Sequence, residues 1–289
     1  MNKKIIFDPL TEQVIELAIR EDIGIGDITT EAIFTDDIFA EGHFLVKEDG
    51  IIAGLDFVEK IFHNIDPSVE FKSNLVNGDK VSIGTIAAEV SGKAKSLLTS
   101  ERTALNFMQR MSGIATATAS YIELIKHTNA KLLDTRKTVP GLRMIDKLAV
   151  LYGGGKNHRM GLFDMFLIKD NHIAIAGSIS NAVMACKSFR IKNNIEAKIE
   201  VEVTSSAQIE ETIEACVDII MLDNFSVVEM DSSVKQINKR CLIEASGGVN
   251  LSTIKSIAET GVDFISVGAI THSVKALDIS LELSIRKNN

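Results

Sequence analysis

The chain has 289 residues, of which 45% are hydrophobic and 24% charged, with only three prolines. This composition indicates a globular protein and excludes a disordered or collagen-like chain, while the length fits two modest domains or one large α/β unit. The formal net charge of −8 argues against nucleic acid and anionic membranes as main partners, because both are bound through excess Lys and Arg.

Targeting and cysteine patterns predict a soluble, cytoplasmic protein. The N-terminal apolar run, residues 5–7, is too short for a signal peptide. The longest stretch without Asp, Glu, Lys or Arg, residues 171–186, falls short of the ~20 apolar residues that a membrane span needs. Cys186, Cys216 and Cys241 are widely spaced without a C-x-x-C motif, which favours reduced packing residues over disulfides or a zinc site.

The first part of the chain has the pattern of a mixed α+β region. Amphipathic periodicity predicts helices, and short apolar runs between Gly or Asn-Gly turns predict strands. The predicted elements are a helix at 9–20, strands at 41–47, 68–73 and 85–93, a helix at 55–64 and a long helix at 96–127. Gly113 is a point of interruption in the long helix.

From residue 132 onward the pattern becomes strand, loop and helix, repeated. The predicted strands lie at 132–135, 165–169, 198–203, 218–222, 241–245 and 264–267. Several are continuous apolar runs, which is typical of a parallel sheet covered on both faces. Charged or small polar residues follow nearly every strand, which favours an α/β barrel over a doubly wound sheet. Since a full barrel has eight strands and the sequence offers six, we predict an incomplete barrel.

Positive charge is concentrated in one segment. Residues 131–170 contain eight basic and four acidic residues, a local net charge of +4 against −12 for the remainder. The cationic candidates are Arg136, Lys137, His158, Arg159 and Lys169, with Arg102 as an outlier on the long helix. Arginine forks bind carboxylates bidentately, so this set indicates a small substrate with more than one anionic group. The alternative is a set of structural salt bridges.

Two turns rich in small residues follow the last two predicted strands. Ser246-Gly247-Gly248 and Gly268-Ala269 each lead into a predicted helix, whose N-terminus favours a phosphate. The alternative is that these glycines only make tight turns. The run GGGK at 153–156 is not a P-loop, because the Ser or Thr that should follow it is absent.

Glu202 and Asp223 end two neighbouring predicted strands. Their carboxylates suit one Mg²⁺ or a pair of ribose hydroxyls. Glu200 has the same strand parity as Glu202, so the sequence does not separate the two. An ordinary ion pair or a helix cap is the alternative for Asp223.

Eight runs together show a family resemblance. They are SERTALN at 100–106, DTRKT at 134–138, GGKNHR at 154–159, LIKDNH at 167–172, EVEV at 200–203, LDNF at 222–225, SGG at 246–248 and SVGAITHS at 266–273. In order and spacing they resemble quinolinate phosphoribosyltransferases, also called carboxylating nicotinate-nucleotide pyrophosphorylases, over essentially the whole chain. Lys156 is a local departure, because an uncharged residue is expected there.

The resemblance implies a fold and an activity. The fold is an N-terminal α/β open sandwich, residues 1–114 joined by a C-terminal helix at 273–289, with an incomplete six-stranded α/β barrel at 115–272. The enzyme is a pentosyltransferase of NAD biosynthesis that converts quinolinate and phosphoribosyl pyrophosphate to nicotinate mononucleotide, pyrophosphate and CO₂ with Mg²⁺. The assembly is a homodimer or a larger set of dimers, such as a hexamer.

The resemblance also implies roles for individual residues. Arg136, His158 and Arg159 bind the quinolinate carboxylates, joined by Arg102 from across the dimer interface. The catalytic set is Lys137, Lys169, Glu202 and Asp223, of which the two acids also lie near the metal, directly or through water. The rest of the substrate-binding set is Thr135, Ser246, Gly247, Gly248, Val267, Gly268, Ala269 and His272.

Three rival functions remain open from sequence. A nicotinate phosphoribosyltransferase, or a paralogue for another carboxylated ring, would need fewer cationic partners than this chain offers. Lys169 at a barrel strand end could form the Schiff base of an aldolase. A non-catalytic sugar-phosphate binder would not need acids beside the basic cluster.

Overall fold

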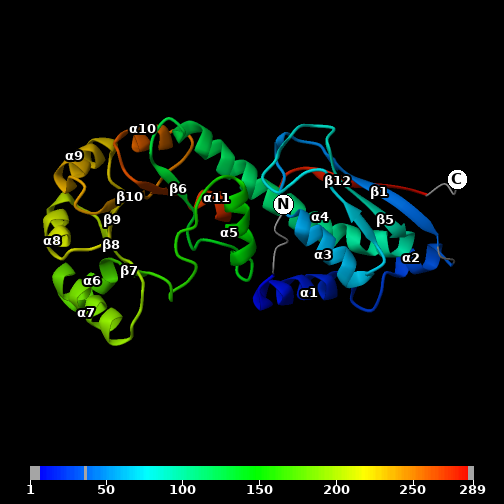
Figure 1. The fold of residues 1–289 in the computed structure, drawn as a ribbon, viewed down its shortest axis with the longest axis horizontal. Coiled ribbons are helices and arrows are strands. Elements are labelled where there is room, and N and C mark those ends of the chain that lie inside the picture. Colours follow the sequence, from blue (N-terminus) through cyan, green and yellow to red (C-terminus); the bar gives the residue numbers. More distant parts are fainter. Residues whose placement is uncertain (1–6, 36–37, 286–289) are drawn as a thin grey trace. The chain divides into compact units, whose positions relative to one another are not determined.

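The computed structural model describes residues 7–35 and 38–285 (Figure 1). They form two compact units. Unit 1 comprises Met1–Ala119, Thr138–Gly154 and Ser273–Asn289, and unit 2 comprises Ser120–Lys137 and Gly155–His272. The segment 138–154, which the sequence analysis placed in the barrel domain, is therefore part of unit 1.

Unit 1 is built on an antiparallel sheet with the strand order β12-β1-β5-β3. Its strands are β1 (Phe39–Val46), β3 (Glu70–Lys72), β5 (Ile86–Lys93) and β12 (Ile279–Ile285), with β2 (Gly50–Ile51) and β4 (Lys80–Val81) as a separate pair. Alternate residues of β1 are buried, so one face of the sheet is apolar. Phe44 on that face meets Phe62 edge to face, which packs a helix against the sheet.

The helices of unit 1 follow from caps and apolar faces. They are α1 (Pro9–Ile23), α2 (Ile28–Ile33), α3 (Leu55–Ile65), α4 (Ala94–Ile125), most of which lies in this unit, and α5 (Arg143–Tyr152). The Asp8 carboxylate caps α1 by accepting from the backbone N–H groups of Leu10 and Thr11. Phe57 of α3 stacks on Phe107 of α4, so the sheet, α3 and α4 form successive layers.

Two predictions for this unit are wrong. The long helix α4 is continuous through Gly113, where an interruption was predicted. Residues 279–285 form the strand β12, antiparallel to β1, instead of part of a helix at 273–289. The segment Ile279-Ser280-Leu281-Glu282-Leu283 alternates apolar and polar residues, which is the period of a strand.

Unit 2 contains a sheet of six parallel strands in the order β6-β11-β10-β9-β8-β7. They are β6 (Lys131–Leu133), β7 (Phe166–Ile168), β8 (Ile199–Val203), β9 (Ile219–Asp223), β10 (Leu242–Ser246) and β11 (Phe264–Ser266). Each overlaps one of the six predicted strands. In β8 and β9 most side chains are buried, as expected where both faces of a parallel sheet are covered.

The barrel is incomplete, as predicted. β6 and β7 are consecutive strands in the chain but lie at the two edges of the sheet, and no pairing between them closes the barrel in the described residues. At the free edge of β6, Leu133 forms an isolated parallel β-bridge with Lys156. Helices lie around the outside of the strands (Figure 1). Those labelled in the figure are α6 (Asp170–Ala176), α7 (Ile179–Lys192), α8 (Ile209–Glu214), α9 (Val227–Ile237) and α10 (Ile254–Glu259). The unit also contains η1 (Ser206–Gln208) and α11 (Ala269–His272), which follows β11. Across the described ranges, none of the helices has both the length and the hydrophobicity to cross a bilayer.

Candidate active site

A cavity of about 830 Å³ opens at the C-terminal ends of the unit 2 strands. Its lining comes entirely from unit 2, from the ends of β6 to β11 and the loops that follow them. In α/β barrels the active site lies at this end of the sheet, because the loops that follow the strands come together there.

A basic wall follows β6. The Thr135 hydroxyl accepts from the backbone N–H of Lys137, and the Lys137 carbonyl accepts from the Thr271 hydroxyl, so the turn is fixed at both ends. Arg136 lines the cavity, and its Nε is buried with no hydrogen-bond acceptor among the described residues. A buried donor of this kind costs free energy unless a ligand supplies the acceptor.

The second arginine enters on the segment beside β6. The backbone N–H of His158 donates to the buried Asp134 carboxylate at 2.9 Å, which holds the segment against the strand end. Arg159 also lines the cavity. Burial, and then the charge of Arg136, lowers the pKa of Arg159, while Glu200 and Asp164 act in the opposite direction. Two guanidinium groups close enough to oppose each other form a site for a dianion.

Lys169 and the two predicted acids line the cavity as well. Lys169 Nζ forms an ion pair with Glu202 at the end of β8. Asp223 ends β9, and its Oδ2 accepts from the Asn224 side chain at 2.8 Å. Glu202 lines the cavity whereas Glu200 is fully buried beneath it, which separates the two acids that the sequence left open.

The predicted phosphate turns have different surroundings. Gly247 and Gly248 have φ angles of +92° and +62°, and a Cβ at Gly247 would lie 2.2 Å from Asn224 Oδ1, so glycine is required there. Helix α10 begins only at Ile254, so the expected helix N-terminus next to this turn is wrong. Gly268, by contrast, directly precedes α11.

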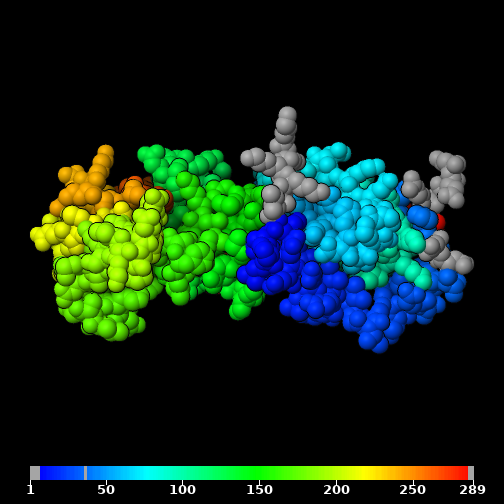
Figure 2. Space-filling view, turned by 60° about the horizontal axis from the view of Figure 1, so that its bottom comes forward, coloured from blue at the N-terminus to red at the C-terminus, as the bar shows by residue number. Residues whose placement is uncertain are grey.

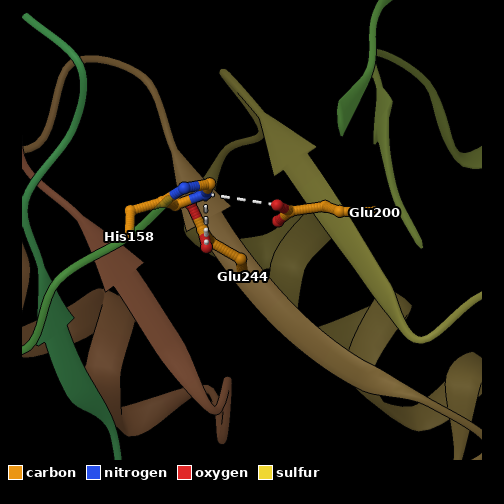
Figure 3. A group of neighbouring side chains, drawn as sticks. All are labelled: His158, Glu200 and Glu244. Carbon is orange, nitrogen blue, oxygen red and sulfur yellow. Dashed lines mark ion pairs between the residues drawn. The ribbon is translucent and has the colours of Figure 1, made fainter. Parts of the chain in front are cut away.

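Below the cavity, His158 lies against two buried carboxyl groups (Figure 3). Its Nε2 is 3.2 Å from Glu200 Oε2 and 3.5 Å from Glu244 Oε2. Burial raises the pKa of Glu200 to about 7. Burial, and then the charge of Glu200, raises the pKa of Glu244 to about 8.

Comparison with known proteins assigns the family. The sequence model for the C-terminal domain of quinolinate phosphoribosyl transferase matches residues 114–282, and that for the N-terminal domain matches 27–112. The chain belongs to the quinolinate phosphoribosyltransferase family. It is 48% identical over 286 residues to a relative from Nicotiana tabacum named quinolinate phosphoribosyltransferase [decarboxylating] 1b, with 93% of this chain and 81% of the relative covered.

Two bacterial proteins are also similar to this chain, one in sequence and one in solved structure. A Bacillus subtilis protein named probable nicotinate-nucleotide pyrophosphorylase [carboxylating] is 42% identical, with 92% of this chain and 90% of the relative covered. A solved structure of the nicotinate-nucleotide pyrophosphorylase from Francisella tularensis superposes with a TM-score of 0.90 at 40% identity, covering 97% of this chain and 98% of that one.

The cavity of this family member brings most of the predicted site residues together. Those that line it are Thr135, Arg136, Lys137, His158, Arg159, Lys169, Glu202, Asp223, Ser246, Gly247, Gly248, Val267, Gly268, Ala269 and His272. Arg102 is outside the lining, on an exposed position of α4 in unit 1.

Sequence reasoning missed part of the lining. The additional residues are Leu167, Met221, Asn224, Glu244, Val249 and Ser266. Glu244 had a signal, because it is a charged residue inside the otherwise apolar run Leu242-Ile243-Glu244-Ala245. A charge in a strand that is buried on both faces needs a partner, and here the partner is His158.

Proposed function

We propose that this chain transfers the phosphoribosyl group of phosphoribosyl pyrophosphate to the ring nitrogen of quinolinate, giving nicotinate mononucleotide, pyrophosphate and CO₂. The observation that supports the proposal is the buried Nε of Arg136, which has no acceptor within residues 7–35 and 38–285 and lies near a second cavity guanidinium, that of Arg159. The two vicinal carboxylates of quinolinate supply acceptors and charge for both arginines. Nicotinate, with one carboxylate, would leave one of them uncompensated.

The rest of the cavity fits phosphoribosyl pyrophosphate. The turns at Gly247-Gly248 and Gly268 allow close approach of backbone N–H groups to the 5′-phosphate. Lys137 follows β6 and Lys169 follows β7, and both line the cavity, where they can neutralise the leaving pyrophosphate. Lys169 Nζ is held in an ion pair with Glu202, which disfavours the Schiff-base chemistry of an aldolase, since that chemistry needs a free amine.

The reaction follows from charge placement. As the bond between ribose C1 and the pyrophosphate oxygen breaks, the ribose becomes cationic, and the Glu202 or Asp223 carboxylate stabilises it. The pyridine nitrogen of quinolinate supplies the electron pair of the new bond to C1. The alkylated nitrogen is then cationic, so it accepts electron density when the bond from C2 to its carboxylate breaks, and C2 takes up a proton as CO₂ leaves. The chain supplies positioning and electrostatics without a covalent intermediate.

Mg²⁺ is the proposed cofactor. Glu202 and Asp223 end adjacent strands of the cavity wall and offer the hard carboxylate oxygens that this ion prefers, directly or through water. When bound, the ion would neutralise charge on the departing pyrophosphate. The donor set therefore fits the group.

A homodimer, or a hexamer built from dimers, is the proposed assembly, with Arg102 of one chain completing the site of the other. Each unit carries large exposed apolar side chains, as interaction surfaces do. In unit 1, α1, α2 and the turn between them lie on the surface (dark blue in Figure 2) and expose Ile25, Ile28 and Ile33. In unit 2, Phe163 and Ile175 are 81% and 90% exposed.

A cytoplasmic location is proposed as well. It is supported by the reduced state expected of the three cysteines, which have no disulfide partner in the described residues. Fractionation of the source cells, with the protein detected by antibody, tests it, and recovery in an organelle or membrane fraction would contradict it.

One assay tests the proposed function. Pyrophosphate and CO₂ release are measured with quinolinate and with nicotinate, each with and without Mg²⁺. Both products should form in equal amounts with quinolinate, depend on Mg²⁺, and be absent or strongly reduced with nicotinate. Pyrophosphate release with nicotinate and none with quinolinate would assign the rival activity.

A further inference from the structure

The imidazole of His158 has a protein partner at each ring nitrogen. The backbone N–H of Arg159 donates to Nδ1 at 2.7 Å, and Nε2 faces the Glu200 and Glu244 carboxyl groups. The His158 side chain is only 8% exposed, and the two glutamates are essentially fully buried. Although His158 borders the cavity, both of its nitrogens are thus engaged within the protein.

These contacts define one tautomer. A nitrogen that accepts from a backbone N–H carries a lone pair, so the single ring proton is on Nε2 and the ring is neutral. Nε2–H then faces the Glu200 carboxyl group, at an Nε2 to Oε2 distance of 3.2 Å. The same tautomer argues against a metal ion among His158, Glu200 and Glu244, although their atoms lie within 4.8 Å of one another, because a metal would need the lone pair on Nε2.

The two glutamates reach His158 because of strand register. Glu200 on β8 pairs with Ile219, and Glu244 on β10 pairs with Met221, two residues along on β9. Residues two apart on a strand share a face, so both carboxyl groups lie on the same inner face of the curved sheet, on either side of β9. The backbone therefore builds the pair.

We propose that Glu200 and Glu244 form a buried carboxyl pair that positions His158 in its neutral Nε2–H tautomer and thereby fixes the backbone and guanidinium of Arg159 at the dicarboxylate end of the cavity. His158 is then a positioning residue that does not bind the substrate through a ring nitrogen. The inference rests on the proposed function for the identity of the dicarboxylate, but the tautomer itself does not depend on it.

The surroundings of the pair are consistent with this role. Arg159 and Lys169 stabilise the charge on Glu200, whereas Glu202 opposes it. His158 Nε2 lies 3.5 Å from Glu244 Oε2, so its N–H dipole faces that carboxyl group as well.

The test compares variants that keep or remove the acceptor. Glu200→Gln and Glu244→Gln retain a side-chain oxygen, whereas Glu200→Leu and Glu244→Leu remove it. Ile220→Ala is the matched control, because Ile220 is fully buried on the neighbouring strand and its parity places it on the opposite face of the sheet. Each full-length variant is assayed for the KM of quinolinate, the KM of phosphoribosyl pyrophosphate and kcat, and its histidines are ¹⁵N-labelled for NMR.

We expect the His158 signal, assigned by its loss in His158→Asn, to show protonated Nε2 and unprotonated Nδ1 in the wild type and the Gln variants. The Leu variants should lose this pattern and raise the KM of quinolinate by about tenfold or more, the effect of one misplaced charged contact, with the KM of phosphoribosyl pyrophosphate nearly unchanged. Ile220→Ala should lose stability and keep the wild-type KM values.

Unprotonated Nε2 in the wild type would overturn the proposal, as would folded Leu variants with an unchanged KM for quinolinate. Equal changes in both KM values would also overturn it, because they would indicate general damage. If the Leu variants do not fold, Glu200→Asp replaces them, since the shorter side chain withdraws the carboxylate, and the same shift in the KM of quinolinate is expected. A wild-type enzyme that shows the tautomer but does not turn over quinolinate would contradict the proposed function alone.

Discussion

Arg136 and Arg159 are two cationic side chains that line the same cavity, where the charge of Arg136 destabilises the charge of Arg159. Burial and the Arg136 charge both lower the pKa of Arg159, so the empty arrangement costs free energy. A dianionic ligand turns this cost into stabilisation, because each guanidinium then pairs with a carboxylate of the ligand. The two residues thus select for a diacid through the penalty that a monoacid leaves in place.

Replacing Arg136 by Ala should reduce kcat/KM for quinolinate by roughly 30-fold to 1000-fold, since losing a charged contact at a desolvated site costs about 2–4 kcal/mol. Steady-state kinetics and the urea midpoint measure activity and folding separately. Arg136→Lys keeps the positive charge but loses the planar guanidinium, so its kcat/KM should lie between those of the wild type and Arg136→Ala. Wild-type kinetics in a folded Arg136→Ala protein would remove Arg136 from the site.

The cysteines should differ in reactivity. Burial raises the pKa of the Cys241 thiol to about 11, and Asp263 adds to that effect while Arg240 opposes it. Because thiolate is the reactive form, only on the order of 0.1% of Cys241 is reactive at pH 8, and its labelling should rise as pH approaches 11. Iodoacetamide at pH 8 should modify the exposed Cys216 first, as read by peptide mass spectrometry. Equal labelling of both in the native protein would contradict this, and labelling after unfolding in urea is the control.

Site residues were predictable where they follow strands and less so where they lie inside them. Arg136, Lys169 and Asp223 come at the polar ends of apolar runs, a position that sequence reveals directly. Glu200 and Glu244 lie within strands, and their partner His158 comes from a distant segment. Only the register across β9 brings the three together, and register is a tertiary property.

Helix α4 carries a glycine that its own secondary structure does not need. A Cβ at Gly113 would lie 2.2 Å from the backbone carbonyl oxygen of Lys275, in the segment that leads to β12. The sequence pattern marked Gly113 as a helix breaker, but its physical role is to allow this close approach.

Gly113→Ala should therefore lower the free energy of unfolding by about 1–3 kcal/mol through overpacking, even though Ala favours a helix by about 1 kcal/mol. Ala117→Gly, in the same helix, is the matched control and should cost about 1 kcal/mol through propensity alone. Urea denaturation followed by circular dichroism measures both. A higher free energy of unfolding for Gly113→Ala would contradict this prediction, because it would mean that the backbone at Lys275 moves away from the added Cβ without cost.

The elements most easily predicted were those that bury a continuous apolar run. The six parallel strands were found within one or two residues at most ends, because burial on both faces leaves a strong local signal. β12 is harder to predict although its residues alternate, because its partner β1 lies more than two hundred positions earlier in the chain.

At the scale of the whole molecule, the uneven charge of the chain has a place in the fold. The cationic segment 131–170 supplies Arg136, Lys137, Arg159 and Lys169 to one cavity, while the acidic excess is spread over the rest of the sequence. The arrangement attracts small anions locally and keeps the molecule acidic as a whole.

If Arg102 completes the partner's site, two inactive variants should rescue each other. Arg102→Ala and Lys169→Ala are each inactive alone, but a mixed dimer holds one site with both native residues. Random mixing should restore about a quarter of the wild-type activity, since half of the dimers are mixed and each has one intact site. Tandem affinity tags isolate the mixed dimers, and the absence of activity in them would exclude a shared site.

Both sheets are finished by strands that come late in the chain. β1 pairs with β12, and β6 pairs with β11. A ribosome delivers the chain from its N-terminus, so β1 and β6 emerge long before the strands that cover their edges. One edge of β1 and one edge of β6 therefore have no partner until late in synthesis, and exposed strand edges of this kind attract other chains. The yield of active protein in a cell should accordingly depend on translation speed and on chaperones that shield these edges until residue 285 has been made.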